Sequence, residues 1–434
     1  MTKKIEINVG LFGLGTVGSA LLEYLEKEYN EEKTGVKINI KKIVVKDLNK
    51  NRGKKFDSYI ISDNIEDILS DKDINLVIEL IGGYEPARTL ILKSFENKKD
   101  VVTANKAVIS KFGIEILKKA IKTKRNLAYQ AAACGETRII NELSNIPSYN
   151  IEKIIGIVNG TTNYILSLME DGMEFNEALE DAREKGYTEA DESFDIDGVD
   201  AAHKLIILTA NAFGKFPEYD NINIEGISQI EKEDIKYANK LGYKIKPIVL
   251  AAKRDDIFEL RVSPALISKS STLSSVKYDN NGISIYIKDK KFPRIIIGSG
   301  SGGRPTANSV ITDIVDLANR ESSKQINNYF NSIASKMKSQ NINNNIIFDN
   351  YSLYYYVRLL VSNSPGVLYN ITKILSKNNI NVSNAIQSEK SEIGKETPLI
   401  LTLETRDQKS IDKAMNELNQ MPIVKKSIKI MILE

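Results

Sequence analysis

The chain has 434 residues, and its 60 Lys and Arg nearly balance its 57 Asp and Glu, giving a formal net charge of +3. This length suggests two or three domains, and the charge balance argues against nucleic acid as a partner. A single histidine and a single cysteine exclude a disulfide within the chain and argue against a Cys/His zinc site. Scarce cysteine fits a reducing compartment, so we expect a cytoplasmic protein. The longest apolar runs, such as 205–210, are too short to span a membrane.

The first region, residues 1–150, alternates strand and helix patterns. Such alternation predicts an α/β, doubly wound parallel sheet of the dinucleotide-binding (Rossmann) type. The expected strands are 5–9, 38–45, 76–80 and 101–103, and the expected helices are 17–25, 86–96 and 114–122.

The pattern changes over residues 151–320, where we predict an α+β domain for substrate binding and oligomerisation. Its expected helices are 177–185 and 199–211, and its expected strands are 248–252, 258–262, 283–287 and 294–297. A polar, Asn-rich stretch at 321–352 is interpreted as a linker.

Residues 353–434 then show the order β-α-β-β-α-β, which predicts a ferredoxin-like domain. The expected strands are 354–361, 380–387, 398–405 and 424–433, and the expected helices are 367–377 and 408–418.

A glycine-rich turn, Gly13-Leu14-Gly15-Thr16-Val17-Gly18, follows the first strand and opens a helix. In such a turn the first glycine permits the tight bend, the second admits a pyrophosphate, and the third allows close packing. The helix N-terminus adds N–H groups and a positive dipole end. We therefore predict a dinucleotide site, with contacts from Phe12, Gly13, Gly15, Thr16, Val17 and Gly18.

The end of the second strand favours NADP over NAD. An acidic residue there binds the ribose 2′-OH of NAD, whereas this segment, KKIVVKDLNKNRGKK at 41–55, is strongly basic. Lys46 and Arg52 are the cations expected to bind a 2′-phosphate. A solvated basic edge with no ligand is the alternative.

Two further segments carry candidate reactive groups. Thr103 ends a parallel strand, and Lys106 follows it at the edge where such sheets bind ligands; a simple helix cap is the alternative. Farther along, Glu189, Asp195, Asp200 and Lys204 lie in an acidic stretch that leads into a buried helix. Asp200 and Lys204 are one helical turn apart, so this cluster suits a substrate with an ammonium group and an oxygen to be protonated. A solvated, acidic helix cap is the other interpretation.

Several blocks in the same order resemble homoserine dehydrogenases that carry a C-terminal ACT domain. They are GLGTVG, ELIGGYEPA (79–87), VVTANKA (101–107), GIVNGTTNYIL (156–166), GYTEAD (186–191), DIDGVDAAHKL (195–205) and GSGSGGRPTA (298–307). The resemblance implies an oxidoreductase of threonine and methionine biosynthesis that interconverts L-aspartate 4-semialdehyde and L-homoserine with NADP or NAD. It also implies a homodimer or homotetramer.

The same resemblance implies roles for individual residues. Lys204 would donate the proton, and Lys106 would lie by nicotinamide and substrate; these two form the catalytic set. Glu189, Asp195 and Asp200 would hold the substrate, while Thr103, Gly186 and Gly302 would face the cofactor.

One segment departs from the family pattern. Where the family has E-A-x-V-x-G-G-I-P, this chain reads QAAACGETR at 130–138. The family commonly binds Na⁺ or K⁺ there, which here would use the backbone of Gln130, Ala133, Gly135 and Thr137. Arg138 would pair with Glu136 or bind an anionic group.

In the ACT-like domain, the turn Asn363-Ser364-Pro365-Gly366-Val367 resembles the effector loop of the family. The resemblance implies L-threonine as the effector, bound by Asn363, Gly366 and Val367. An ACT module that only joins subunits is the alternative.

Two other functions remain open from the sequence. A phosphorylating semialdehyde dehydrogenase would use Cys134 as a nucleophile with His203 as its base. A non-catalytic amino-acid sensor would use the ACT-like domain without turnover.

Overall fold

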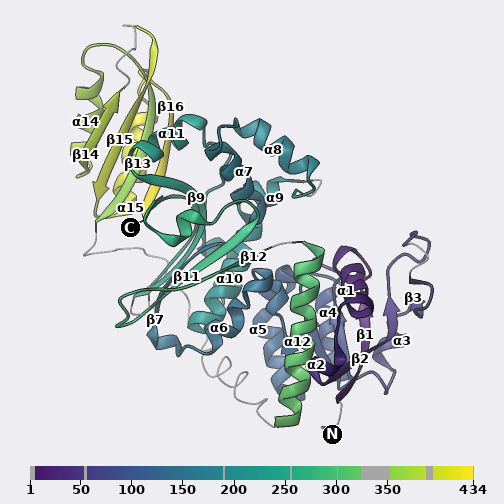
Figure 1. Cartoon of the computed structure of the whole chain (residues 1–434). Helices are drawn as coiled ribbons and strands as arrows, with labels where there is room; N and C mark the ends of the chain where they lie inside the picture. The colour runs from purple at the N-terminus through teal and green to yellow at the C-terminus, as the bar shows by residue number, and fades with distance from the viewer. Residues whose placement is uncertain are drawn as a thin grey trace. The chain divides into compact units, whose positions relative to one another are not determined.

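The computed structural model describes residues 5–52, 56–188, 191–254, 257–300, 302–323, 352–387 and 394–433. They form two compact units that alternate along the chain (Figure 1). Unit 1 draws on 1–152, 201–222 and 280–341, and unit 2 draws on 153–200, 223–279 and 342–434.

Unit 1 is built on the parallel sheet that the sequence predicts. Its strand order is β3-β2-β1-β4-β5-β6, with parallel pairing throughout. The strands are β1 Ile5–Phe12, β2 Val36–Val44, β3 Ile61–Ser62, β4 Leu76–Glu79, β5 Asp100–Thr103 and β6 Leu127–Ala128. The order reverses after β1, so the carboxyl ends of β1 and β4 border the crevice where doubly wound sheets bind ligands.

The helices that pack on this sheet include one that the sequence patterns missed. Helix α12 (Gly303–Ser323) buries Ala307, Val310 and Ile314 in the same apolar cluster as Leu21 and Leu22 of α1. The remaining helices and the hairpin of unit 1 are α1 Thr16–Lys27, α2 Glu31–Thr34, α3 Glu66–Leu69, α4 Ala87–Glu96, α5 Lys106–Thr123, α6 Ile139–Ser144, β11 Asn280–Ile287 and β12 Arg294–Ser299. Helix α10 (Val199–Phe213) begins in unit 2 and continues into unit 1.

Unit 2 contains a mixed sheet in the order β7-β9-β10-β16-β13-β15-β14, with the short β8 pairing with β10. Its strands are β7 Ile151–Ile157, β8 Asn223–Ile224, β9 Tyr243–Arg254, β10 Ile257–Ser268, β13 Leu353–Ser362, β14 Asn381–Gln387, β15 Glu396–Thr405 and β16 Val424–Leu433. Its helices are α7 Gly160–Glu170, α8 Phe175–Glu184, α9 Ser193–Ile196, α11 Lys232–Lys240, α14 Val367–Lys377 and α15 Gln408–Asn419.

The last six elements of the described chain have the predicted β-α-β-β-α-β order, so the ferredoxin-like domain is confirmed. This ACT-like domain is part of a larger sheet. Strand β16 pairs antiparallel with β13 on one side and parallel with β10 on the other, through Ala265–Met431 and Ile267–Leu433 among others. The two antiparallel sheets of unit 2 are therefore one hydrogen-bonded structure.

Most of the predicted linker, residues 324–351, lies outside the described residues. The sequence predicts three consecutive domains, and these stay a prediction. Each of the two compact units is instead made of three separate segments that alternate along the chain. Among the residues that the structure describes, no helix is both long and apolar enough to cross a membrane.

Candidate active site

The glycine-rich turn has the geometry that a pyrophosphate site requires. Gly13 has φ of +98°, and a Cβ on it would lie 2.7 Å from the carbonyl oxygen of Leu80. A Cβ on Gly18 would lie 2.5 Å from the carbonyl oxygen of Gly13, so neither position admits a side chain. At Gly15 a Cβ would meet nothing within 4 Å, which leaves open space over the N-terminus of α1. These glycines fit a dinucleotide, which would fill that space with its phosphates.

A second helix N-terminus lies beside this turn. A Cβ on Gly303, the first residue of α12, would lie 3.1 Å from Cγ2 of Thr16, the first residue of α1. Gly302, a predicted cofactor contact, has φ of +109° just before α12. Gly186, the other predicted glycine contact to the cofactor, has φ of +72° and lies two residues after the end of α8 in unit 2.

The basic segment after β2 forms a turn beyond the sheet. Lys46 is exposed, and Arg52 donates from Nη2 to the carbonyl of Asp47 at 2.7 Å and from Nη1 to that of Lys50 at 3.0 Å. Arg52 thus closes the turn that follows Lys46.

At the ends of β4 and β5, a buried carboxylate organises the segment that carries Lys106. Glu79 is fully buried and accepts a 2.6 Å hydrogen bond from the hydroxyl of Thr103. Asn105 caps α5, since its Oδ1 accepts the backbone N–H of Val108 at 3.1 Å. Lys106 is the first residue of that helix and is half-buried. The sequence reasoning missed Glu79, although an acidic residue at the end of an apolar strand is the signal that points to it.

Helix α10 carries Asp200 and Lys204 one turn apart, and the two residues are 2% and 8% exposed. The buried lysine that the sequence predicted is therefore present. His203 is buried next to it, with its Nε2 at 3.5 Å from the hydroxyl of Tyr84 and its ring in contact with Tyr219.

Two of the predicted substrate carboxylates are brought together in unit 2 by a buried asparagine. Nδ2 of Asn159 donates to Oδ1 of Asp195 at 2.7 Å and to Oδ2 of Asp200 at 2.9 Å. The other end of the same amide caps α7, because Oδ1 accepts the N–H and the hydroxyl of Thr162, both at 2.8 Å. The sequence analysis assigned no role to Asn159, although an Asn-Gly pair that follows a strand is a capping signal. Glu189, the third predicted carboxylate, lies outside the described residues.

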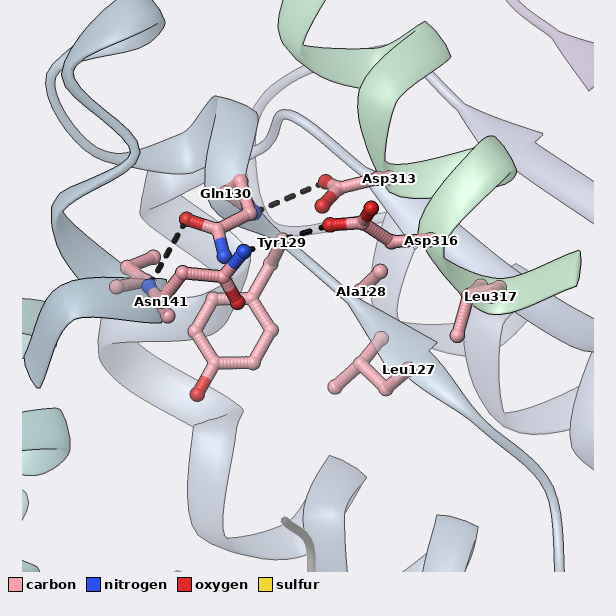
Figure 2. Close-up of a pocket in the computed structure, with 9 residues that line it drawn as sticks. Leu127, Ala128, Tyr129, Gln130, Asn141, Asp313, Asp316 and Leu317 are labelled. Atoms are coloured by element: carbon pink, nitrogen blue, oxygen red, sulfur yellow. Dashed lines mark hydrogen bonds between the residues drawn. The ribbon is translucent and has the colours of Figure 1, made fainter. Parts of the chain in front are cut away.

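The segment that departs from the family pattern is fixed by α12. The backbone N–H of Gln130 donates to Asp313 at 3.0 Å (Figure 2). Arg138 pairs with Asp316 at 2.6 Å rather than with Glu136. Burial raises the pKa of Asp313 well above its usual range. A cavity of 20 Å³ lies here and is far too small for an amino acid or a nicotinamide; it is lined by Leu127, Ala128, Tyr129, Gln130, Ile140, Asn141, Asp313, Asp316 and Leu317.

Cys134 lies in this segment with its side chain 1% exposed and with φ of +59°. A buried thiol is inaccessible to an aldehyde in solution, and reactive cysteines are partly exposed. This burial disfavours the thiol-based alternative.

The predicted effector turn begins after β13. Gly366 has φ of +86° and precedes α14, whose first residue is the buried Val367. Asn363 donates its backbone N–H to Lys395 at 2.8 Å, and its Oδ1 accepts from Nε2 of Gln387 at 3.4 Å.

Comparisons with known proteins agree with this fold and these groups. The model of the homoserine dehydrogenase NAD-binding domain matches residues 13–130, that of homoserine dehydrogenase matches 139–315, and that of the ACT domain matches 355–422. The homoserine dehydrogenase of Helicobacter pylori is 38% identical over 99% of this chain and 100% of its own.

Solved structures give the same result. A crystal structure of a homoserine dehydrogenase from Thiobacillus denitrificans has a TM-score of 0.87 and 34% identity, over 99% of this chain and 98% of that one. A hyperthermophilic archaeal homoserine dehydrogenase in complex with NADPH has a TM-score of 0.61 and 26% identity, over 74% of this chain and 98% of that one. The chain therefore belongs to the homoserine dehydrogenase family and is an oxidoreductase of the CH–OH group with a nicotinamide-dinucleotide-binding domain.

Proposed function

We propose that Lys204 is the proton donor and that Asp195 and Asp200 bind the ammonium group of L-aspartate 4-semialdehyde during its reduction to L-homoserine. The observation that carries this proposal is the amide of Asn159, which bridges Asp195 and Asp200. Because the amide of Asn159 is a neutral donor, it brings the two carboxylates together without placing a positive charge beside them. Asp200 also lies one turn from Lys204, so the ammonium-binding group and the proton donor would lie on the same helix, α10.

When bound, a nicotinamide cofactor would supply the hydride for the aldehyde carbon, and the aldehyde oxygen would take a proton from this chain. Lys204 in its ammonium form gives that proton and is recharged from water, so the reduction consumes one hydride and one proton. A positioned acid of this kind contributes about 10²–10⁴-fold to the rate. Lys106 would stabilise the negative charge that develops on the oxygen, and Glu189 stays a prediction as a further substrate ligand.

The preference for NADP is a further part of the proposal. Arg52 closes the turn that follows the exposed Lys46, after the strand whose end meets the ribose in this fold. Two cations at that place favour a 2′-phosphate. The related archaeal enzyme was solved in complex with NADPH.

A sodium or potassium ion would act as a structural ion at the main-chain carbonyls of Gln130, Ala133, Gly135 and Thr137. Gln130 is the least available of them, because its carbonyl accepts the N–H of Ala133 at 3.2 Å and its side chain accepts that of Asn141 at 3.3 Å. No catalytic step proposed here passes through this ion. Equal melting temperatures in sodium, potassium and choline chloride would contradict the ion site.

We also propose regulation by L-threonine, bound through Asn363, Gly366 and Val367. A homodimer or homotetramer and a cytoplasmic location complete the proposal. The left-handed conformation of Gly366 turns the backbone between β13 and α14, the place expected for an amino-acid effector. Inhibition by threonine in the wild type, and its loss in N363A with unchanged basal turnover, is the expected result.

The central test is an assay of turnover. Purified protein with L-homoserine and NADP⁺ is expected to raise the absorbance of the reduced nicotinamide, and NAD⁺ is expected to be the poorer cofactor. An amino-acid sensor would bind threonine in a calorimeter without any turnover, and a phosphorylating enzyme would require phosphate and lose activity in C134S.

A further inference from the structure

One buried carboxylate of unit 1 stands out because it has no role in the proposed chemistry. Glu79, at the end of β4, is fully buried, and its hydrogen-bond partners in the described part of the chain are all uncharged. Burial raises the pKa of Glu79, and the donors around the carboxylate act in the opposite direction. A buried carboxylic side chain without a cation is costly, which calls for a reason beyond packing.

The first reason is the strand end that precedes Lys106. Thr103 accepts the N–H of Asn105 at 3.0 Å, so its own hydroxyl proton is available for Glu79. Asn105 is held at both ends, since Oδ1 caps α5 and Nδ2 donates to the carbonyl of Gly83 at 2.8 Å and to Glu79 at 3.5 Å. Lys106 is the next residue. Glu79 thus orients the start of the helix that carries Lys106.

The second reason is the loop that packs on the dinucleotide turn. The N–H groups of Ile81 and Gly82 donate to Oε1 of Glu79 at 2.8 and 3.4 Å. Leu80 precedes these two residues. Its N–H donates to the carbonyl of Phe12 at 2.8 Å, and its own carbonyl oxygen lies 2.7 Å from where a Cβ on Gly13 would be. One carboxylate therefore joins the dinucleotide turn to the strand end that leads to Lys106.

We propose that Glu79 is a positioning residue of the reaction, which fixes Lys106 and the loop 80–83 relative to the cofactor turn. This inference rests on the proposed function of Lys106. The carboxyl ends of parallel strands are the ligand-binding edge of such a sheet. Asp100 offers the matched contrast, because it is a buried carboxylate at the opposite end of the neighbouring strand β5, where it binds Asn126 at 2.8 Å.

The test compares E79Q with D100N, both assayed well below their melting temperatures. Because small displacements at a reacting centre are costly, E79Q is expected to lose about 10- to 100-fold in kcat and to bind NADPH about tenfold more weakly. D100N is expected to lower the melting temperature while kcat and NADPH affinity change by less than about twofold, because its hydrogen bonds lie at the other edge of the sheet. If E79Q loses stability as D100N does and keeps both kinetic and binding constants, Glu79 is only structural and the inference is wrong.

N105D gives a second test that does not depend on the folding of E79Q. Aspartate caps a helix as well as asparagine does, so the cap of α5 tolerates this change. The new carboxylate would instead face Glu79 and the carbonyl of Gly83, and we expect kcat to fall about tenfold or more. Unchanged kcat in N105D would contradict the inference. If the wild type binds NADPH without oxidising homoserine, the proposed function fails, and the NADPH affinities of E79Q and D100N still decide whether Glu79 positions the loop.

Discussion

Arg358 of β13 holds Asp234 of α11 through two hydrogen bonds, from Nε at 2.7 Å and from Nη2 at 3.0 Å. The two side chains are 3% and 0% exposed, and the hydroxyl of Tyr356 donates to the same carboxylate at 2.8 Å. Asp234 also accepts the N–H of Glu231 and so completes the cap of α11. This buried cluster ties the ACT-like domain to the rest of unit 2.

Removing one partner of that pair is expected to destabilise unit 2 strongly. R358M leaves the carboxylate of Asp234 buried without its cation, which typically costs about 3–5 kcal/mol. Chemical denaturation measures the change. K377A is the control, since Lys377 pairs with Glu417 on the surface, and such pairs contribute at most about 1 kcal/mol. A loss in R358M no greater than that in K377A would show that the buried pair is energetically neutral.

Lys204 is expected to be indispensable for turnover and dispensable for cofactor binding. K204M removes the proton donor, and K204R keeps the charge but cannot release a proton at neutral pH. Both variants are expected to lose about 10²–10⁴-fold in kcat, while a fluorescence titration shows unchanged affinity for NADPH. Undiminished turnover in either variant would reassign the donor, with Lys106 as the next candidate.

Asn159 is expected to control substrate affinity rather than the stability of α7. N159S retains a good capping residue, but serine is too short to bridge Asp195 and Asp200. Without the bridging amide the two carboxylates repel each other, so the KM for homoserine is expected to rise about tenfold.

The matched control for N159S is N163A on the same helix. Asn163 is a buried asparagine whose Nδ2 donates to the carbonyl of Tyr278 at 2.9 Å, and it contacts neither Asp195 nor Asp200 in the described hydrogen bonds. N163A should reduce stability and leave KM unchanged. Equal effects of the two variants on KM would indicate a general loosening of α7.

Asp313 is expected to make stability fall as the pH rises. Its folded-state pKa is raised by burial, so the folded protein retains a proton that the unfolded chain releases near pH 4. This contribution to stability is present at low pH and is lost between the unfolded and the folded pKa values. The difference in unfolding free energy between wild type and D313N should therefore shift in favour of D313N as the pH is raised above about 4. A difference that stays constant over this range would contradict the prediction.

The preference for NADPH is expected to weaken when two residues of the basic turn are removed, if this turn binds a 2′-phosphate. The double variant K46A/R52A is expected to lower the ratio of kcat/KM for NADPH over NADH by about tenfold or more, since each lost phosphate contact is a charge-assisted hydrogen bond. K37A serves as the control, because Lys37 lies near the start of β2 and pairs with Glu6. An unchanged ratio in the double variant would place the preference elsewhere.

Local patterns predicted much of this fold. The first ACT-like helix was expected at 367–377 and α14 has those bounds, because its apolar side chains recur along a single face. Helix α5 starts at Lys106, eight residues before the expected position 114. Its first turn is stabilised by the cap of Asn105, and the spacing of apolar residues does not reveal such a hydrogen bond. Helix α12 was missed for a related reason, because its apolar face is explained only by packing on α1.

In the candidate site, too, local motifs identified some residues and missed those that act through long-range contacts. Motifs located Gly13, Asp200 and Lys204, whose chemical types and spacing are visible in the chain. Glu79 and Asn159 act through hydrogen bonds to residues 24 and 41 positions away, among others, and such long-range partners are not encoded in any local pattern.

The pairing of β16 with β10 also determines when the sheet of unit 2 can be completed during synthesis. Ile267 is synthesised long before its partner Leu433, so the residues of β10 that pair with β16, Ala265–Ile267, lack that partner while the intervening residues are translated. Contacts between such distant residues form slowly, and an open strand edge can pair with other chains. A nascent chain stalled before residue 424 would lack β16, so this part of β10 would stay open. The sheet is completed only when β16, the last of its described strands to be synthesised, has left the ribosome.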